Sequence, residues 1–523
     1  NARRILFREG SLMKTMNFDV VIFGGSLGGT LAAYSAAKSG KSVGLFEKTE
    51  WIGGQLTSQA VPPDEHKWIE ETGCSGTYRA YRNAVRNYYR NHPMIADELK
   101  NKEFFCPGGS TVSRLSHPPR LALKLLTEML QPYIDSGKLQ IFYRCVLLEA
   151  KTDEDTVRSI GVKSGEKTFC VTGKYFLDAD DEGELIYKSG CEYVTGAESK
   201  DMTGEPSACD GYMPEDRQPV TWSMAFENRR TGDYVIEKPE EYDYFVKKIM
   251  PYDRYPVFSM YGPDSSTGKA KRFGMFNGET DQSGGKLFGL FTYRRIVNSA
   301  YFKGNYEPFD VTMLNWPQND YFFGNTFDDA RENEHRYMAK QLTKSFFYWL
   351  QTEAPNGEKK GYPFFAPSTE ATGTDDGMTK TYYVRESRRI KAKFTVREQD
   401  LTEGNPDFFD SVGVGSYPID LHITTKTHSF FYKPSQRFTI PLGSMIPVRI
   451  KNLIPACKNI GTTHLTGGCY RLHPVEWSVG EAAGFLASYA IDRNCEIAEV
   501  RENPEKLKEF QRLLRENGAQ LHW

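Results

Sequence analysis

Short apolar runs alternate with a small-residue stretch near the start of the chain. Residues 20–23 and 43–46 are apolar runs of the kind found in strands that are buried on both faces of a parallel sheet. The stretch 30–38 between them is rich in alanine and serine, and we expect a helix there that packs closely on the sheet. The order strand, helix, strand predicts a βαβ unit and an α/β fold.

Helical and alternating patterns follow this unit. Residues 78–89 and 118–130 carry apolar side chains at helical spacing and predict two helices. Between about 139 and 175 apolar and polar positions alternate around turn residues, which predicts strands at 139–143, 145–150, 157–162 and 168–171 in a small antiparallel meander. The apolar run 175–179 then predicts a return to a buried parallel strand.

Three further patterns complete the chain. The apolar run 451–457 predicts another strand of the first domain, and after a loop we expect a helix from about Pro474. The segment from Asn503 to Gly518 has the start and stop signals of an amphipathic helix, with Leu507, Phe510 and Leu514 on its buried face. Most of the aromatic clusters lie between residues 191 and 439, which we assign to a second domain.

The composition favours small-molecule chemistry. A chain of 523 residues is too long for one simple core, so at least two packed regions are expected. The formal net charge of −2 provides no field that would hold nucleic acid or an anionic membrane surface. No apolar run is long enough to span a bilayer. We therefore expect a small-molecule substrate and neither a nucleic-acid nor a membrane partner, while the oligomeric state stays open.

Nine cysteines are scattered along the chain without a CxxC pair. An odd and dilute set of this kind argues against a disulfide framework and against a zinc site. It suits a reducing compartment. We expect no metal site and a cytoplasmic location.

A glycine-rich turn joins the first predicted strand to its helix. It reads Gly24-x-Ser26-x-x-Gly29, and Glu47 ends the next strand about twenty residues on. Such a turn brings a pyrophosphate to the first amide groups of the helix, and an acid at this distance accepts hydrogen bonds from a ribose diol. Ser26 replaces one glycine of the fingerprint, but its side chain is small and its hydroxyl can donate to phosphate. These residues predict a dinucleotide site.

With these pieces in place, the chain resembles the FAD-dependent oxidoreductases that have a glutathione-reductase-like FAD fold. The resemblance runs from about residue 18 to residue 490. The glycine turn with Glu47 matches the ADP-binding element, and residues 53–57 match the glycine pair that approaches the flavin. Residues 176–183 look like the strand and turn that usually end in Ala-Thr-Gly, with Asp180 in the threonine position.

The closing part of the chain resembles the last FAD block of the same family. The matching stretches are residues 453–461 and 467–484. Cys457-Lys458 stands where many relatives have a Gly-Asp pair, so contacts to the cofactor there are expected to differ. The resemblance implies FAD as the cofactor and the following contact residues: Gly24, Gly25, Ser26, Leu27, Gly28, Gly29, Glu47, Lys48, Gly53, Gly54, Gln55, Leu56, Thr57, Val146, Ala179, Asp180, Lys458, Leu472 and His473.

The resemblance also implies a plan of domains. A Rossmann-like FAD-binding domain with a βαβ unit and three layers takes residues 17–190, including the meander, and residues 440–490. An α+β substrate or cap domain of residues 191–439 is inserted between these two parts. Residues 491–523 form a helical tail.

Several related enzyme classes do not fit the sequence. A second complete GxGxxG is absent, since the stretch at Gly413-Val-Gly415 lacks the last glycine, so a built-in NAD(P)H domain is not expected. The CxxC pair of the disulfide reductases is missing as well. No two tryptophans stand in the W-x-W arrangement of the flavin-dependent tryptophan halogenases. The remaining reaction is oxidation or reduction of an organic substrate at flavin N5.

Hydride transfer from an alcohol or amine also needs a base, and histidine titrates in the right range. His473, His464 and His66 are the candidates, because the first two share a loop that the resemblance places beside the flavin and the third follows the glycine pair. His422 ranks lower. Arg471 is the candidate for stabilising charge, since a guanidinium fork binds planar acceptors.

Two neighbouring arginines can be interpreted either as ligand-binding residues or as members of internal salt bridges. Arg388 and Arg389 could hold a carboxylate in the same way as Arg471, but an internal salt bridge, for example with Glu386, is favoured slightly. Cys469 is expected to be an unreactive buried thiol rather than a covalent flavin link.

The sequence therefore predicts an FAD-dependent oxidoreductase. It would dehydrogenate a polar small molecule, either an alcohol or an amine, with sugar-like compounds among the possible substrates. The electrons would pass to oxygen or another acceptor. Two alternatives stay open: a flavin-dependent reductase that uses externally supplied electrons, and a non-catalytic FAD-binding protein.

Overall fold

The computed structural model describes residues 14–264 and 267–523. Its central sheet is rich in parallel pairs and confirms the predicted Rossmann-like α/β fold. Across the sheet the strands are β3 (Leu139–Phe142), β2 (Val43–Phe46), β1 (Lys14–Phe23), β6 (Lys167–Asp178), β5 (Thr156–Ser164) and β4 (Cys145–Asp153), and β23 (Leu453–Pro455) also pairs with β6. The antiparallel part β4, β5 and β6 corresponds to most of the predicted meander, but the strand expected in it at 139–143 is β3, which pairs parallel with β2.

The last four residues of β1, 20–23, are buried on both faces, which explains their continuous apolar run. Val20 and Ile22 belong to the core cluster that contains helices α1 (Leu27–Lys38) and α13 (His473–Arg493). Val21 and Phe23 belong to a different cluster with the meander strands. Since neighbouring side chains on a strand point to opposite faces, β1 joins two layers of packing.

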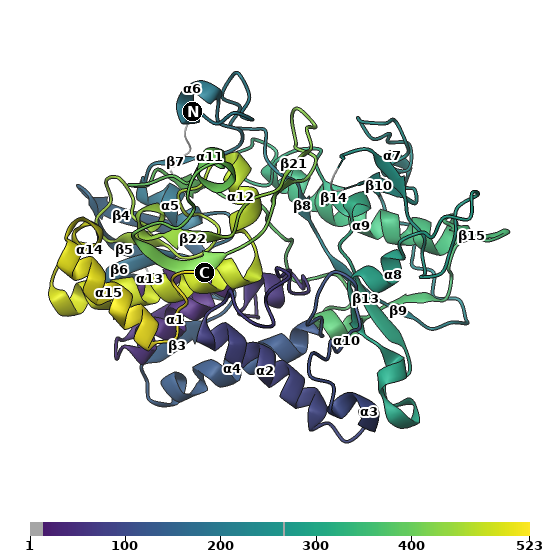
Figure 1. The fold of residues 1–523 in the computed structure, drawn as a ribbon, viewed down its shortest axis with the longest axis horizontal. Helices are drawn as coiled ribbons and strands as arrows, with labels where there is room; N and C mark the ends of the chain where they lie inside the picture. Colours follow the sequence, from purple (N-terminus) through teal and green to yellow (C-terminus); the bar gives the residue numbers. More distant parts are fainter. Residues whose placement is uncertain (1–13, 265–266) are drawn as a thin grey trace.

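Helices α1 and α13 lie against each other, although 448 residues separate Gly28 from Glu476. A Cβ at Gly480 would lie 2.2 Å from the carbonyl oxygen of Gly28, and one at Gly484 would lie 2.3 Å from that of Ala32. The small residues of both helices therefore permit the close approach. In Figure 1 the yellow α13 crosses over the purple α1.

The first part of the chain contains the two helices that the sequence predicted, but some helix and strand boundaries differ from the predicted ones. The predicted helices are α2 (Gly76–Arg90) and α4 (Pro119–Asp135). Helix α1 starts three residues earlier than expected, because Ser26 caps it. The two strands expected at 168–171 and 175–179 are one strand, β6, since β1 pairs with it along nearly its whole length.

The inserted part contains an antiparallel sheet packed against a long helix, to the right in Figure 1. Its strands run in the order β12 (Arg295–Val297), β13 (Asp310–Leu314), β9 (Met224–Asn228) and β17 (Phe365–Pro367), and the helix is α9 (Glu332–Thr352). Aromatic side chains fill the core between them, among them Phe226, Trp316 and Phe346. Most of the aromatic residues of this region are thus core residues.

The C-terminal region packs back onto the first part. Helix α14 (Ile497–Glu502) leads to α15 (Pro504–Glu516), and the predicted face of Leu507, Phe510 and Leu514 is buried. A helix that the sequence analysis took for a loop, α12 (His464–Tyr470), precedes α13. Thr463 caps it, because its side chain accepts a hydrogen bond from the amide of Thr466 at 3.2 Å.

Shorter elements complete the described residues. The helices are α3 (Asp97–Lys100), α5 (Glu184–Ser189), α6 (Lys200–Thr203), α7 (Tyr242–Phe245), α8 (Leu290–Tyr293), α10 (Thr369–Thr372) and α11 (Glu398–Thr402). The strands are β7 (Tyr193–Val194), β8 (Val220–Thr221), β10 (Tyr261–Pro263), β11 (Ala270–Arg272), β14 (Asp320–Tyr321), β15 (Pro355–Asn356), β16 (Lys359–Lys360), β18 (Arg389–Ile390), β19 (Ser411–Gly415), β20 (Ile419–Leu421), β21 (Phe431–Lys433) and β22 (Phe438–Pro441). None of the helices within residues 14–264 and 267–523 has the length and apolarity to cross a membrane.

Candidate functional site

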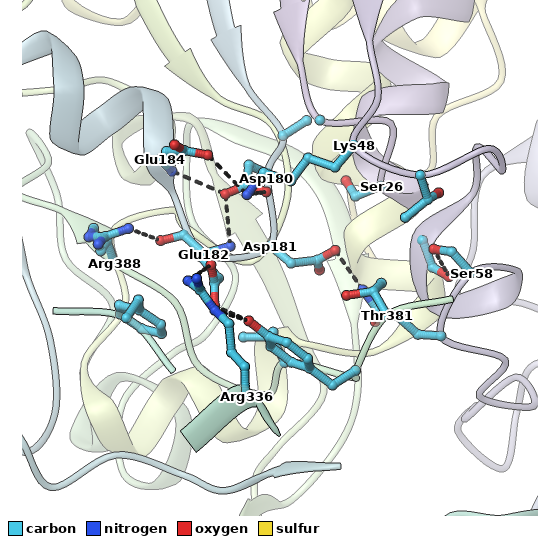
Figure 2. Close-up of a pocket in the computed structure, with 18 of the residues that line it drawn as sticks. Ser26, Lys48, Ser58, Asp180, Asp181, Glu182, Glu184, Arg336, Thr381 and Arg388 are labelled. Atoms are coloured by element: carbon cyan, nitrogen blue, oxygen red, sulfur yellow. Dashed lines mark hydrogen bonds and ion pairs between the residues drawn. The ribbon is translucent and has the colours of Figure 1, made fainter. Parts of the chain in front are cut away.

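A cleft of about 620 Å³ opens where the strands β1, β2 and β6 end. Residues that directly follow these strands line it, which is the usual ligand position in an open α/β sheet. Eight of the predicted cofactor residues are among the lining: Gly24, Ser26, Glu47, Lys48, Gly54, Val146, Ala179 and Asp180. The inserted part contributes Arg336, Tyr382 and Arg388 to the opposite wall. Figure 2 shows this cleft.

The glycine turn after β1 has no room for side chains. Gly24 has a φ of +97°, and a Cβ there would lie 2.2 Å from the carbonyl carbon of Ala179. Ser26 follows with its Oγ accepting a hydrogen bond from the amide of Gly29 at 3.2 Å, so it caps α1. Ser26 lines the cleft, so α1 begins there and its dipole favours an anion, while the amides of Gly28 and Gly29 donate to Glu476 and Ser26.

Glu47 lies at the end of β2, as the fingerprint requires. Its carboxylate accepts hydrogen bonds from the amides of Gly25 at 2.6 Å and Thr49 at 2.7 Å. Burial raises the pKa of Glu47, against the lowering effect of these hydrogen bonds. Beside it, Lys48 Nζ pairs with Asp180 at 2.8 Å and with Glu184 at 3.0 Å, as Figure 2 shows.

The second glycine pair abuts the first turn. Gly53 donates a backbone hydrogen bond to Gly25 at 2.8 Å, and a Cβ at Gly54 would lie 2.8 Å from Ser26 Cα. The next residues serve the loop itself: Leu56 is buried in the core, and Thr57 Oγ1 donates to the carbonyl of Ile52 at 2.5 Å. Of this loop, Gly54 is the predicted residue that lines the cleft.

A buried charge cluster ties the start of α13 to both glycine turns. Lys458 Nζ pairs with Asp181 and lies 3.7 Å from Glu476 Oε2, and the nearby charges raise the pKa of Lys458 despite its burial. Glu476 also accepts from the amide of Gly28 at 3.0 Å and from Gln55 Nε2. Gln55 Nε2 donates in addition to the carbonyl of Arg471 at 3.3 Å. Lysine in place of aspartate thus gives this corner a cation.

A second, smaller cavity of about 70 Å³ is lined by polar groups from both parts of the chain. Its residues are Asp64, Val112, Tyr293, Arg294, Asn315, Trp316, Pro317, Tyr383, Arg385, Tyr417, Asp420, His422 and Arg471. The segment 381–385 separates it from the large cleft, because Tyr382 and Val384 line the cleft whereas Tyr383 and Arg385 line the cavity.

His422 is fixed at this cavity by a buried carboxylate. Its Nδ1 lies 2.6 Å from Asp320 Oδ2, and Arg385 donates to Asp320 Oδ1 at 2.9 Å. Burial alone would raise the pKa of Asp320, but Arg385 and His422 lower it to about 2. Burial and the charge of Arg385 lower the pKa of His422. The ring is therefore neutral near pH 7, with Nδ1–H donating to Asp320 and Nε2 left to accept a proton.

The three predicted histidines are not gathered at this cavity. His473 is the first residue of α13, and its Nδ1 accepts from the amide of Asp64 at 3.0 Å while Nε2 lies 3.1 Å from the carbonyl of Val61. Burial lowers its pKa to about 3. Both ring nitrogens thus hold the 61–64 loop on α13, and neither is available to a substrate.

His464 and His66 also have structural partners. His464 begins α12 and lines another cavity; its Nδ1 lies 2.8 Å from Glu386, whose charge raises the pKa of His464 although burial opposes this. His66 Nε2 lies 2.9 Å from the carbonyl of Gly73, and its ring packs edge-on against Trp523. The expected common loop of His464 and His473 is therefore wrong: they lie on two successive helices.

The candidate arginines fall into two groups: those in internal salt bridges and those that line the small cavity. Arg389 pairs with Glu386 and with Glu198, and Arg388 pairs with Asp328 at 2.6 Å, so the salt-bridge interpretation holds for both. Arg471 lines the small cavity, where Nη1 donates to Tyr383 Oη at 3.1 Å and Nη2 to Asp420 Oδ2 at 3.3 Å. Arg294 lines the same cavity and was not anticipated.

The geometry of the large cleft suits an adenine dinucleotide: an acid for a ribose, a helix start for a pyrophosphate, and the exposed side chain of Val146 for an aromatic ring. The chain matches the family model described as FAD dependent oxidoreductase over residues 19–514. It belongs to this family. The protein is an FAD-dependent oxidoreductase, and FAD is its cofactor.

Individual relatives are more distant. The soluble pyridine nucleotide transhydrogenase of Chromohalobacter salexigens is 30% identical over 90 residues, which are 17% of this chain and 19% of that protein. The match thus spans about a fifth of that relative. A p-nitrophenol 4-monooxygenase from Pseudomonas putida is 11% identical, with a TM-score of 0.35 over 97% of this chain and 88% of the other. A geranylgeranyl bacteriochlorophyll reductase-like protein from Thermoplasma acidophilum is 10% identical, with a TM-score of 0.32 over 97% of this chain and 85% of the other.

Proposed function

We propose that the protein dehydrogenates a polar small molecule, an alcohol or amine, in the small cavity, and that the electrons leave to oxygen or another acceptor. One observation carries the proposal: the cavity is lined by His422, whose Nδ1 is held by the buried carboxylate of Asp320, and by residues of the segment 381–385, which also lines the cofactor cleft. When bound, FAD supplies the hydride acceptor of the oxidation.

His422 is the proposed base, in place of His473, His464 and His66. The substrate carbon loses a hydride and its hydroxyl or ammonium group loses a proton, so that a carbonyl or a protonated imine (iminium) remains. His422 Nε2 accepts that proton, since Asp320 holds Nδ1 as the donor and stabilises the imidazolium that forms. Asp320 is a positioning residue, because it acts through the ring of His422.

Residues of the first part hold the cofactor in this proposal. Glu47 binds the adenosine ribose, the start of α1 binds the pyrophosphate, and Lys458 supplies a positive charge at the corner between them and α13. Arg471 directly precedes Leu472, the N-cap of α13. The Arg471 guanidinium and the positive end of the helix dipole together stabilise negative charge at the start of α13.

The proposal is tested by mixing the FAD-loaded protein anaerobically with alcohols and amines while recording the flavin absorbance. Bleaching by one of them, with kcat/KM falling at least about a hundredfold in His422→Asn, is the expected result. Bleaching by externally supplied reductant alone, followed by transfer to an added acceptor, would instead mean a reductase. Failure of both half-reactions would mean a non-catalytic flavoprotein.

We also propose that the protein works in the cytoplasm. The support is chemical: all nine cysteines are unpaired, and several are buried, as a reducing compartment allows. Exposure of the purified protein to oxidised glutathione should leave the buried thiols, such as Cys469, unmodified.

A further inference from the structure

We propose that the small cavity binds its substrate through a carboxylate, and that Arg294 is the residue that holds it. The substrate class is then a small acid that carries a hydroxyl or amino group beside the carboxylate. This inference rests on the proposed function, because it names the substrate of the same cavity.

Several side chains around the cavity have buried donors without a partner in the described part of the chain. Five buried side-chain atoms of its lining residues lack a hydrogen-bond partner within residues 14–264 and 267–523: Arg294 Nε, Arg294 Nη1, Trp316 Nε1, Arg385 Nε and Arg471 Nε. All five are N–H groups. Buried donors without acceptors are costly, so a ligand rich in acceptors is favoured here. A carboxylate offers two acceptor oxygens and no donor.

Arg294 is the least satisfied of the three guanidinium groups. Arg385 lies 2.9 Å from Asp320, and Arg471 lies 3.3 Å from Asp420. The nearest carboxylate to Arg294 in the ion pairs is Asp64, with its Oδ2 at 3.6 Å, which is beyond a good charged hydrogen bond. Arg294 is only 8% exposed, so bulk water does not screen its charge fully. It therefore has a free fork for a planar anion.

The volume limits the ligand to a small molecule. One water needs about 10 to 15 Å³ on the same measure as the cavity's 70 Å³, so about five to seven water-sized groups fit. Glycolate, lactate, glycine and alanine have this size. In such acids the C–H that is oxidised is on the carbon next to the carboxylate, so one small cavity can hold both the anchored group and the group that His422 deprotonates.

The carboxylate anchor is tested with acetate and acetamide, which have nearly the same shape and differ in charge. Each is titrated into the FAD-loaded protein, and binding is followed by the flavin difference spectrum and by calorimetry. Acetate should bind at least about tenfold more tightly than acetamide. In Arg294→Lys and Arg294→Gln this preference should fall to less than about threefold, while the exposed control Arg515→Lys keeps it.

Reduction of the flavin separates this inference from the proposed function. Glycolate, lactate, glycine and alanine are compared anaerobically with ethylene glycol, 1,2-propanediol and ethanolamine, and the acids should bleach the flavin faster. If only the neutral compounds bleach it and acetate does not bind, the carboxylate anchor is excluded and the proposed dehydrogenation stands. If no alcohol, amine or acid bleaches it, the proposed function fails. If Arg294→Lys loses FAD but acetate never competes, Arg294 serves the cofactor and the anchor is again excluded.

Discussion

Asp320 Oδ2 lies 2.6 Å from His422 Nδ1, although the two residues are 102 positions apart in the chain. Arg385 and Thr221 bind the other oxygen of Asp320, so the carboxylate cannot turn away from the ring. His422 is the one histidine among the described residues that line the small cavity, and its Nε2 lies 3.9 Å from Asp420 Oδ2.

His422→Asn should lower kcat/KM by about a hundredfold or more, because the proton acceptor is lost. In the unmodified enzyme kcat/KM should be constant above the usual histidine range and fall as the pH drops through the lowered pKa of His422, since the protonated ring cannot accept. The variant should lack this acid limb. His522 offers a matched control: its Nδ1 also lies 2.6 Å from an aspartate, Asp407, but both are exposed. An acid limb that survives in His422→Asn would refute the assignment.

Glu47→Gln should weaken FAD binding by about tenfold, because an amide is a poorer acceptor for a ribose diol than a carboxylate. Its hydrogen bond from Gly25 is retained, so the turn should stay folded. The dissociation constant is measured by flavin fluorescence during reconstitution of the apoprotein. Glu50→Gln, three residues on and exposed, is the control. Equal affinities of the two variants would contradict the placement of the ribose.

Gly28→Ala should impair folding and FAD uptake together, because its Cβ would lie 1.8 Å from the carbonyl oxygen of Ala456. Overpacking of this kind costs about 1 to 3 kcal/mol, and more where backbone must shift. Thermal unfolding and flavin content measure the effect. Gly211→Ala meets nothing within 4 Å and should behave like the unmodified protein. A Gly28→Ala protein with unchanged Tm would show that α1 can move away from the backbone that follows β23 without penalty.

Lys458→Met should destabilise the protein by about 3 to 5 kcal/mol, since the buried Glu476 and the partly buried Asp181 would lose their cation. Urea unfolding measures the loss, and adding Asp181→Asn to the variant should restore part of it. Lys451→Met removes an exposed pair with Glu496 and should leave the unfolding midpoint where it was. An unchanged midpoint in Lys458→Met would contradict the stabilising role of this lysine.

The local parts of the fold were predictable from the sequence. The strand, glycine turn and helix around Gly24 follow from residues close in the chain, and so does the acid at Glu47. The buried face of α15 follows from the spacing of Leu507, Phe510 and Leu514. Helix α12 was missed because Gly467 and Gly468 lie inside it, and these residues usually mark a loop.

The small cavity was not predictable, because its charges come from distant segments. His422 gains its role from Asp320, and Arg294 meets Arg471 only after the inserted part has folded against the first. His473 was ranked high for its position before a helix, but its two nitrogens are taken by backbone groups of the 61–64 loop. For each of these residues the role depends on the contacts that the side chain makes in the fold, and not on its neighbours in the sequence. A signal for His422 did exist, because it directly follows the alternating stretch 419–421, which forms β20.

The segment 381–385 contributes residues to two sites: Thr381, Tyr382 and Val384 line the cofactor cleft, whereas Tyr383 and Arg385 line the small cavity. Inserting or deleting one residue upstream in this stretch would exchange the two sets, placing a cation against the dinucleotide and valine against the second chamber. A change in the length of this segment would therefore disrupt the cofactor cleft and the small cavity together. A substitution that alters a residue of one site would leave the residues of the other site in place. Divergence among enzymes of this design should accordingly proceed here by substitution and not by indels.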